Sequence, residues 1–213
     1  MADAIETVRG RKVVVRFAAK KCIHSRHCVL DRPDVFVPNV PGEWIHPDAA
    51  LPEEIVELAH NCPSGAITFE RLDGGAAEQG PLVNVVRVRE NGPLAFHAPL
   101  AIGAENIGMR ATLCRCGASK NKPYCDSSHV EARFTASGEP PIAESPPLGI
   151  RSGTLTVKPL PNGPLKVNGA LEVVSGTGHT ILRTMETYLC RCGASANKPY
   201  CDGSHARVGF KSG

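Results

Sequence analysis

Short runs of β-branched residues, separated by turn residues, dominate the chain, and helical periodicity is clear in one stretch of its first third. Residues 11–17 (RKVVVRF) predict a strand, and residues 66–72 predict a returning strand. Between them, apolar residues recur at helical spacing from 51 to 59, behind Pro52 and two glutamates, which favours a helix that ends before Pro63. The order strand, loop, helix, strand predicts a compact α+β unit, with turns or a short hairpin over 36–45.

The rest of the chain repeats one pattern. A strand-like run over 82–88 precedes the turn Asn91-Gly92-Pro93-Leu94, and Leu155-Thr156-Val157 precedes a second Asn-Gly-Pro-Leu turn at 162–165. The turns are 71 residues apart and the cysteine motifs behind them 76 apart, so the second copy should hold about five extra residues near 175–179. Such a repeat predicts two similar units.

Linker composition marks the boundaries between these parts. Residues 73–80 are mostly Gly, Ala and polar, and residues 135–153 hold four prolines without a helical period, which predicts a partly extended linker. We therefore predict four segments: a first domain over 1–76, a first repeat over 81–136, a Pro-rich linker over 137–153, and a second repeat over 154–213.

Each repeat carries a sixteen-residue motif with three cysteines and one histidine. The motifs Cys114–His129 and Cys190–His205 differ at two positions, where Lys120 and Ser127 correspond to Ala196 and Gly203. In each motif the first two thiols are one residue apart, and the third thiol lies four residues before the histidine, so a helical turn would bring that last pair together. The spacing predicts two ligand pairs, one for each iron of a 2Fe–2S cluster.

Composition favours a reducing compartment. The nine cysteines fall three to each third of the chain, and their odd number argues against a framework of disulfides. The first twelve residues contain no apolar signal segment, and no run approaches a membrane span. A net charge of +3 gives no case for nucleic acid. We expect a cytoplasmic protein whose thiolates bind metal.

The repeated motif resembles the signature of the CDGSH iron–sulfur domain family. The second copy matches every signature position, and the first departs at Ser127, where the family has Gly; if the backbone there is left-handed, the strain is on the order of 1 kcal/mol. The resemblance implies two 2Fe–2S clusters, and it implies two mostly-β units that pack as a pseudo-dimer within a monomer. Their expected ligands are Cys114, Cys116, Cys125 and His129, and Cys190, Cys192, Cys201 and His205.

The first seventy residues resemble the divergent mono-cluster ferredoxins, through Lys21-Cys22-x-His24-x₃-Cys28 and the segment Asn61-Cys62-Pro63. A typical ferredoxin has a further cysteine three residues after the first, and here that position is Ser25. The three thiols of Cys22, Cys28 and Cys62 favour a 3Fe–4S cluster, or a 4Fe–4S cluster with a weak fourth ligand. His24 or His27 can supply that ligand or donate to a sulfide.

Other residues of the motifs have two interpretations each. Three thiolates and a histidine also form structural zinc sites, although zinc sites seldom use this spacing. Asp126 and Asp202 are expected to cap the helix that carries the histidine, and Ser119 and Ser195 to brace the loop or donate to sulfur. Five cations are either counter-charges for the clusters or ordinary surface residues: Arg115, Lys120, Lys122, Arg191 and Lys198.

The chain contains no nucleophile–base pair, phosphate loop or nucleotide-binding motif, so we expect no enzyme. We expect an α+β electron-transfer protein with three iron–sulfur sites and a redox partner such as a flavoprotein reductase. The alternative is a carrier that donates clusters to apo-proteins, or a redox and pH sensor.

Overall fold

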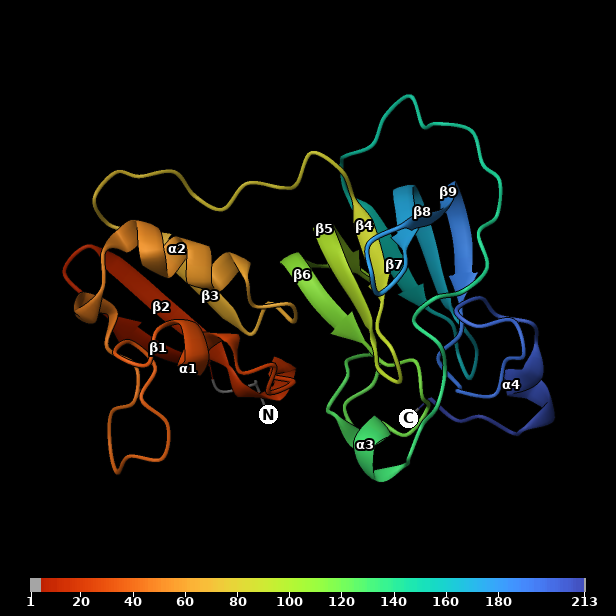
Figure 1. Cartoon of the computed structure of the whole chain (residues 1–213), viewed down its shortest axis with the longest axis horizontal. Helices are drawn as coiled ribbons and strands as arrows, with labels where there is room; N and C mark the ends of the chain where they lie inside the picture. The colour runs from red at the N-terminus through yellow and green to blue at the C-terminus, as the bar shows by residue number, and fades with distance from the viewer. Residues whose placement is uncertain (1–4, 213) are drawn as a thin grey trace. The chain divides into compact units, whose positions relative to one another are not determined.

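The computed structural model describes residues 5–212, and its contacts divide the chain into two compact units, with the boundary between Gln79 and Gly80 (Figure 1). Across the described residues, no helix has the length and apolar character needed to cross a membrane.

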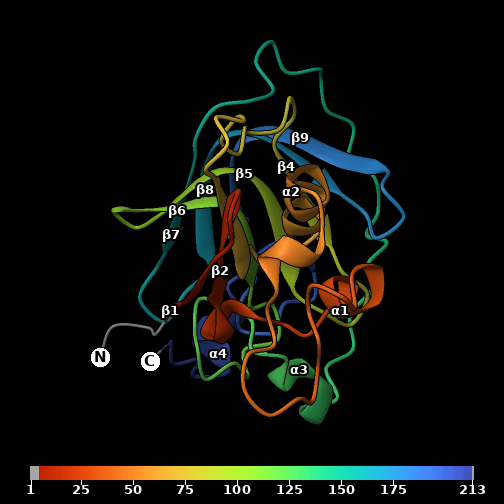
Figure 2. The ribbon, with the colours of Figure 1, turned by 90° about the vertical axis from the view of Figure 1, so that its left-hand side faces the viewer.

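The first unit is a three-stranded antiparallel sheet with two helices, which Figure 2 presents from a second side. Its elements in chain order are β1 (Ile5–Arg9), β2 (Val13–Ala18), a 3₁₀ turn (Ala19–Lys21), α1 (His27–Asp31), a 3₁₀ turn (Pro47–Ala49), α2 (Pro52–His60) and β3 (Ile67–Arg71). The central strand is β2, which pairs with β1 and β3. The predicted strands and helix are confirmed with shifts of one or two residues at their ends. The strand β1 was not predicted, because most of its side chains are exposed and its pattern gives no alternation.

The apolar faces of α2 and β2 form the core of this unit. Ile55 and Leu58 of the helix pack with Val13 and Val15 of the strand. The side chain of Glu54 accepts a hydrogen bond of 2.8 Å from the backbone of Leu51, which closes the first turn of α2. An antiparallel bridge between Phe36 and Ile45 confirms the short hairpin expected over 36–45. The packed helix fixes the position of Cys62, which follows its last turn.

The second unit is built on one six-stranded sheet. Its elements in chain order are β4 (Val85–Val88), β5 (Leu94–Ile102), β6 (Glu105–Leu113), α3 (Ser128–Glu131), β7 (Leu155–Pro159), β8 (Leu165–Val174), β9 (Thr180–Leu189) and α4 (Ser204–Arg207). The short helices α3 and α4 both lie beyond the same end of the sheet (Figure 1).

The two repeats share their first strands in the sheet, because β4 and β7 each pair with a strand of both repeats. Strand β4 pairs antiparallel with β5 of its own repeat and parallel with β8 of the other. Strand β7 does the reverse, pairing antiparallel with β8 and parallel with β5. Each repeat therefore completes the sheet of the other, and the segment Gly80–Gly213 is one compact unit.

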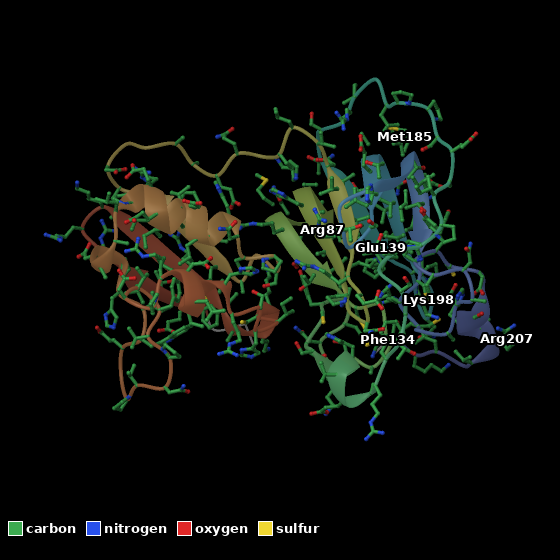
Figure 3. The ribbon with its side chains drawn as sticks, in the orientation of Figure 1. Arg87, Phe134, Glu139, Met185, Lys198 and Arg207 are labelled. Carbon is green, nitrogen blue, oxygen red and sulfur yellow. The ribbon has the colours of Figure 1, made fainter. Side chains whose placement is uncertain are left out.

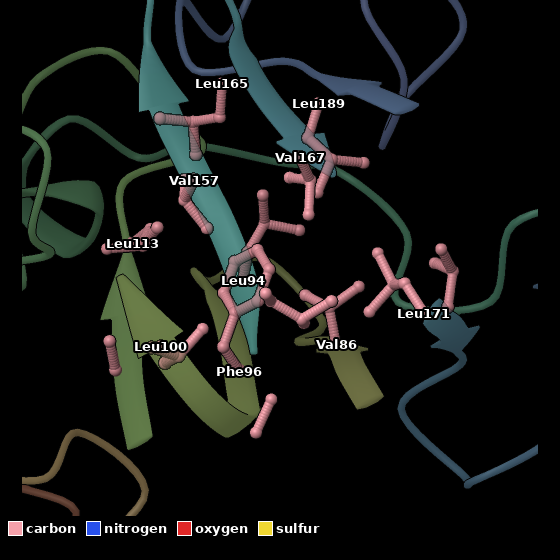
Figure 4. Close-up of a cluster of buried hydrophobic side chains, with 14 of the residues drawn as sticks. Val86, Leu94, Phe96, Leu100, Leu113, Val157, Leu165, Val167, Leu171 and Leu189 are labelled. Carbon is pink, nitrogen blue, oxygen red and sulfur yellow. The ribbon is translucent and has the colours of Figure 1, made fainter. Parts of the chain in front are cut away.

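A single apolar cluster fills the interior of this unit. Phe96, Leu113, Val157 and Leu189, drawn from both repeats, are all at most 1% exposed (Figure 4). The five extra residues of the second repeat lie in the β8–β9 hairpin, which turns over 175–179, whereas β5 and β6 are joined by a tight turn over 103–104. This confirms the offset predicted from the spacing of the motifs.

The Pro-rich segment has no regular secondary structure, but it is hydrogen-bonded to the second unit. Ala143 donates a hydrogen bond of 2.8 Å to the carbonyl of Ile181 in β9. Glu139 accepts hydrogen bonds from the backbone and hydroxyl of Thr177 in the β8–β9 turn, and Arg87 of β4 donates to Gly176 of the same turn (Figure 3). The segment also reaches the first repeat, where the backbone N–H of Gly138 donates to the carboxylate of Glu90, so it connects both repeats along its path.

Asn84, which is fully buried before β4, joins three segments of the second unit. Its side-chain amide donates to the carbonyls of Gly153 and Ala170, at 2.8 and 3.0 Å. We predict that Asn84→Ala lowers the free energy of unfolding by roughly 2–3 kcal/mol, because the buried carbonyl of Ala170 and the part-buried carbonyl of Gly153 both lose their donor. Chemical denaturation of the full chain measures the change. Asn106→Ala, at an exposed position, is the control and should stay within about 0.5 kcal/mol of the parent; an equal effect of both changes would contradict the assignment.

Candidate metal centres

The motif in each repeat forms a closed loop at the end of a strand. After β6, the chain turns back so that Cys114 donates to the carbonyl of Pro123 and Cys125 donates to that of Thr112, at 2.8 and 2.9 Å. The same two bonds recur after β9, from Cys190 to Pro199 and from Cys201 to Tyr188. The first and third cysteines of each motif are therefore held beside each other, although ten residues separate them.

Each loop brings its four predicted ligands together as two pairs. The sulfur atoms of Cys114 and Cys116 lie 3.7 Å apart, and the sulfur of Cys125 lies 3.5 Å from Nδ1 of His129. In the second loop, the sulfur atoms of Cys190 and Cys192 lie 3.7 Å apart. The distance from the sulfur of Cys201 to Nδ1 of His205 is 3.4 Å.

These separations fit one tetrahedral metal for each pair. With metal–sulfur bonds of about 2.3 Å and metal–nitrogen bonds of about 2.0–2.1 Å, a tetrahedral centre sets its S–S ligands roughly 3.8 Å apart and its S–N ligands roughly 3.5 Å apart. The four side chains of a loop form two pairs rather than one group, and among residues 5–212 no three His, Cys, Asp or Glu side chains come together as they would around one ion.

A carboxylate connects the two halves of each loop. Asp126 accepts from the backbone of Ser128, the first residue of α3, at 3.0 Å and from that of Lys120 at 2.8 Å. Asp202 accepts in the same way from Ser204 at 2.9 Å and Ala196 at 2.8 Å. Each carboxylate thus caps the first turn of the histidine helix, as expected. The hydroxyl of Ser204, together with the backbone N–H groups of Ala196 and Ser204, lowers the pKa of Asp202. The carboxylate fixes the histidine relative to the loop that carries the C-x-C pair.

Ser119 and Ser195 brace the loops and do not donate to sulfur. Each hydroxyl donates 2.7 Å to the carbonyl before the third cysteine, that of Tyr124 or Tyr200. Backbone N–H groups donate to the sulfur atoms instead, at 3.4 Å in each case, from Ala118, Ser127, Ala194 and Gly203. Such N–H···S bonds stabilise a thiolate ligand and raise the potential of a cluster bound to it.

The arginine inside each C-x-C pair is buried. Arg115 is 0% exposed and donates to four carbonyls, including Gly92 of the first Asn-Gly-Pro-Leu turn at 2.9 Å. Arg191 is 3% exposed and donates to Gly163 of the second turn, also at 2.9 Å. Lys122 and Lys198 donate to loop carbonyls, and Lys120 is exposed. Of the five cations, the two arginines thus lie nearest the interior.

Phe134 and Phe210 belong to the sites, although the motif did not predict them. Each ring lies against the buried guanidinium of its own repeat, with its centroid 5.4 Å from Cζ of Arg115 or 5.5 Å from Cζ of Arg191. Each phenylalanine follows its histidine by five residues in both repeats, and comparison of the two copies beyond the motif would have revealed it.

The first unit brings its three cysteines to one cavity. Cys22 ends the 3₁₀ turn after β2, Cys28 lies in α1, and Cys62 follows α2. All three line a cavity of about 520 Å³, far larger than a single ion requires. Phe17 and Trp44 form apolar walls that the sequence gave no means to predict.

Ser25, His24 and His27 also line this cavity. Nδ1 of His24 lies 4.0 Å from the sulfur of Cys22, and the backbone N–H of His24 donates to that sulfur at 3.4 Å. His27 instead faces Asp31, at 4.0 Å. His24 is therefore the nearer of the two histidines to a thiol.

Burial raises the pKa of Cys22 and Cys28, and raises that of Cys125 to about 11. The hydrogen bond with Cys116 instead lowers the pKa of Cys114 to about 6. Burial also lowers the pKa of His129, which favours the neutral imidazole that a metal requires. A metal must displace the protons of Cys22, Cys28 and Cys125 when it binds there.

Comparisons with known proteins agree with this geometry. Residues 80–130 and 162–206 match the family model described as "Iron-binding zinc finger CDGSH type". Residues 8–71 match the model described as "Divergent 4Fe-4S mono-cluster". These three ranges contain all eleven predicted ligands. The first range holds four of them, the second four and the third three.

Similar curated proteins carry the same domain name. The chain is 27% identical over 67 residues to "CDGSH iron-sulfur domain-containing protein 1" of Rattus norvegicus, covering 32% of this chain and 58% of that protein. It is 46% identical over 46 residues to "CDGSH iron-sulfur domain-containing protein 2 homolog" of Drosophila ananassae, covering 20% of this chain and 34% of that protein. The chain thus spans less than two thirds of either relative.

The two loops differ in backbone strain where the motifs differ in sequence. Ser127 has φ 68° and Gly203 has φ 84°, so the left-handed conformation anticipated for Ser127 is confirmed. We predict that Ser127→Gly stabilises the first loop by up to about 1 kcal/mol, because relief of strain exceeds the entropic cost of glycine. The reverse change, Gly203→Ser, should destabilise the second loop by a similar amount. Thermal unfolding of the metal-loaded full chain, with iron content checked, measures both; shifts of the same sign would contradict the prediction.

Proposed function

We propose that this iron–sulfur protein, which carries two CDGSH-type domains behind a divergent 4Fe-4S mono-cluster domain, transfers single electrons between partner proteins. We assign one 2Fe–2S cluster to each CDGSH-type loop and a third cluster to Cys22, Cys28 and Cys62. An iron–sulfur cluster supplies a centre that takes up and releases one electron at a time. The residues of this chain hold the ligands, donate to their sulfur atoms and set the local charge.

The ligand pairing carries the proposal. Each loop holds a thiol pair at 3.7 Å and a thiol–imidazole pair at 3.4 or 3.5 Å. This arrangement suits two metals, each bound by one of the two pairs. A single zinc ion would need all four side chains around one point. The pairing therefore favours the dinuclear cluster over the zinc alternative.

The arrangement of the loops suits electron exchange. Both histidines are partly exposed, so each site has one edge within reach of a partner. The opposite pair of each site lies against the sheet, where Cys114 and Cys190 are each 1% exposed. A flavoprotein reductase is a suitable donor, because its two-electron reduced flavin can supply the two CDGSH-type sites with one electron each. No substrate turnover is part of this proposal.

We further infer that the two repeats form an internal pseudo-dimer. The sheet supports this inference. Strands β4 and β7 each pair antiparallel with the next strand of their own repeat and parallel with the corresponding strand of the other repeat. The near-identical geometry of the two ligand loops supports it as well.

The proposal predicts iron, acid-labile sulfide and reversible electron exchange in the purified full chain. A reductase and its reduced nicotinamide should bleach part of the visible absorption under anaerobic conditions, and oxygen-free reoxidation should restore it. Stoichiometric zinc in a colourless protein would refute the cluster assignment. Transfer of cluster to an apo-ferredoxin, with bleaching of this protein, would instead identify it as a carrier.

For the first unit we propose a 3Fe–4S cluster. Ser25 lines the cavity at the position where a typical ferredoxin has the second of its four cysteines, so the site offers three thiols. The oxidised protein should give a narrow EPR signal from this site, whereas the oxidised 2Fe–2S sites are silent. Ser25→Cys should abolish the signal and produce a signal in the reduced state, as a 4Fe–4S cluster forms. His24→Ala is the matched control and should leave the oxidised signal in place. Four irons at this site in anaerobically purified parent protein would show that His24, Ser25 or water is the fourth ligand.

A further inference from the structure

The backbones of the two ligand loops are in contact with each other. A Cβ atom placed on Gly117 would lie 2.5 Å from the carbonyl oxygen of Cys192 in the other loop. A Cβ placed on Gly193 would lie 2.2 Å from the carbonyl oxygen of Cys116. The contact is reciprocal, and it leaves no room for a side chain at either position. The two sites are therefore neighbours whose ligand-bearing backbones touch.

A buried arginine lies inside each C-x-C pair. Arg115 stands between Cys114 and Cys116, and Arg191 stands between Cys190 and Cys192. Arg115 is 0% exposed and Arg191 is 3% exposed. A guanidinium stays charged at neutral pH, so each pair of thiols has a buried cation beside it.

Neither guanidinium is hydrogen-bonded to a carboxylate of the residues that the structure describes. The four hydrogen bonds of Arg115 and the two of Arg191 all go to backbone carbonyls, which solvate the charge without neutralising it. A buried cation is costly unless a negative charge lies near it. A 2Fe–2S core with three thiolates and a histidine carries a net charge of about −1, which supplies that negative charge in the oxidised state.

We propose that the two CDGSH-type sites are electrostatically coupled through their touching loops, so that the charge of one site sets part of the potential of the other. The inference depends on the two 2Fe–2S clusters of the proposed function. When one site gains an electron, its charge becomes one unit more negative. That charge is weakly screened because Cys114, Arg115, Cys190 and Arg191 are all at most 3% exposed. Reduction of one site therefore lowers the potential of the other.

His205→Cys in the full chain tests the coupling. The added thiolate makes the second site more negative and gives it a spectrum distinct from the histidine-ligated first site. Anaerobic titration with dithionite, followed by EPR, then reads the potentials separately. We expect the potential of the second site to fall, and that of the unaltered first site to fall as well. His129→Cys should produce the mirror result.

Substitution of the arginines tests the coupling by charge. In the His205→Cys background, Arg191→Gln removes a buried cation beside the second site and should lower the potentials of both sites. Arg191→Lys should restore most of the shift if charge is responsible. Arg133→Gln, at an exposed position, is the control for a surface charge.

Three results separate the outcomes. If the first-site potential in His205→Cys matches that of the parent, or Arg191→Gln shifts the second site alone, the coupling is wrong. Should the glutamine variants fail to fold, the two histidine variants still decide whether the sites are coupled. A preparation without iron and sulfide refutes the proposed function itself.

Discussion

A guanidinium buried between two cysteine ligands is the interaction on which the second unit depends. Arg115 connects the ligand loop to the Asn-Gly-Pro-Leu turn and to residues 136 and 137, and Phe134 covers its face. Removing the arginine would leave several buried carbonyls without donors. Its charge also needs a negative neighbour, and a cluster held by the adjacent thiolates would supply one. The stability of the loop and the binding of the metal would then favour each other.

The two units position their candidate ligands in different ways. In the second unit, short closed loops fix the ligands through carboxylate, hydroxyl and arginine bonds at the end of a sheet. In the first unit, three separate elements each contribute one thiol to an apolar cavity. A closed loop specifies its ligand geometry locally, whereas a cavity depends on how α2 packs on the sheet. Changes in the core of the first unit should therefore affect its metal site more directly than core changes affect the loops.

The repeat explains why the two loops touch each other. Because the repeats share β4 and β7, both loops lie at one end of a common sheet, and contact at Gly117 and Gly193 follows from that placement. Glycine is required there because any Cβ would enter the carbonyl group of the opposite loop. The same glycines lie inside the motif, so one residue type serves both the turn of its own loop and the contact with the other.

The sequence by itself determined the pairs of candidate ligands, the repeat and the main elements of the first unit, because these depend on spacing along the chain. Cys114 to His129 is a local pattern, and a turn of helix brings Cys125 and His129 together without help from distant residues. The offset of five residues likewise located the longer β8–β9 hairpin. Tertiary structure alone decided that the two repeats share β4 and β7, that Phe134 stacks on Arg115 and that the two ligand loops touch. It also decided that Trp44 and Phe17 line the first cavity. These features join residues far apart in the chain, and hydrophobic period, turn chemistry and motif spacing carry information only over neighbouring residues.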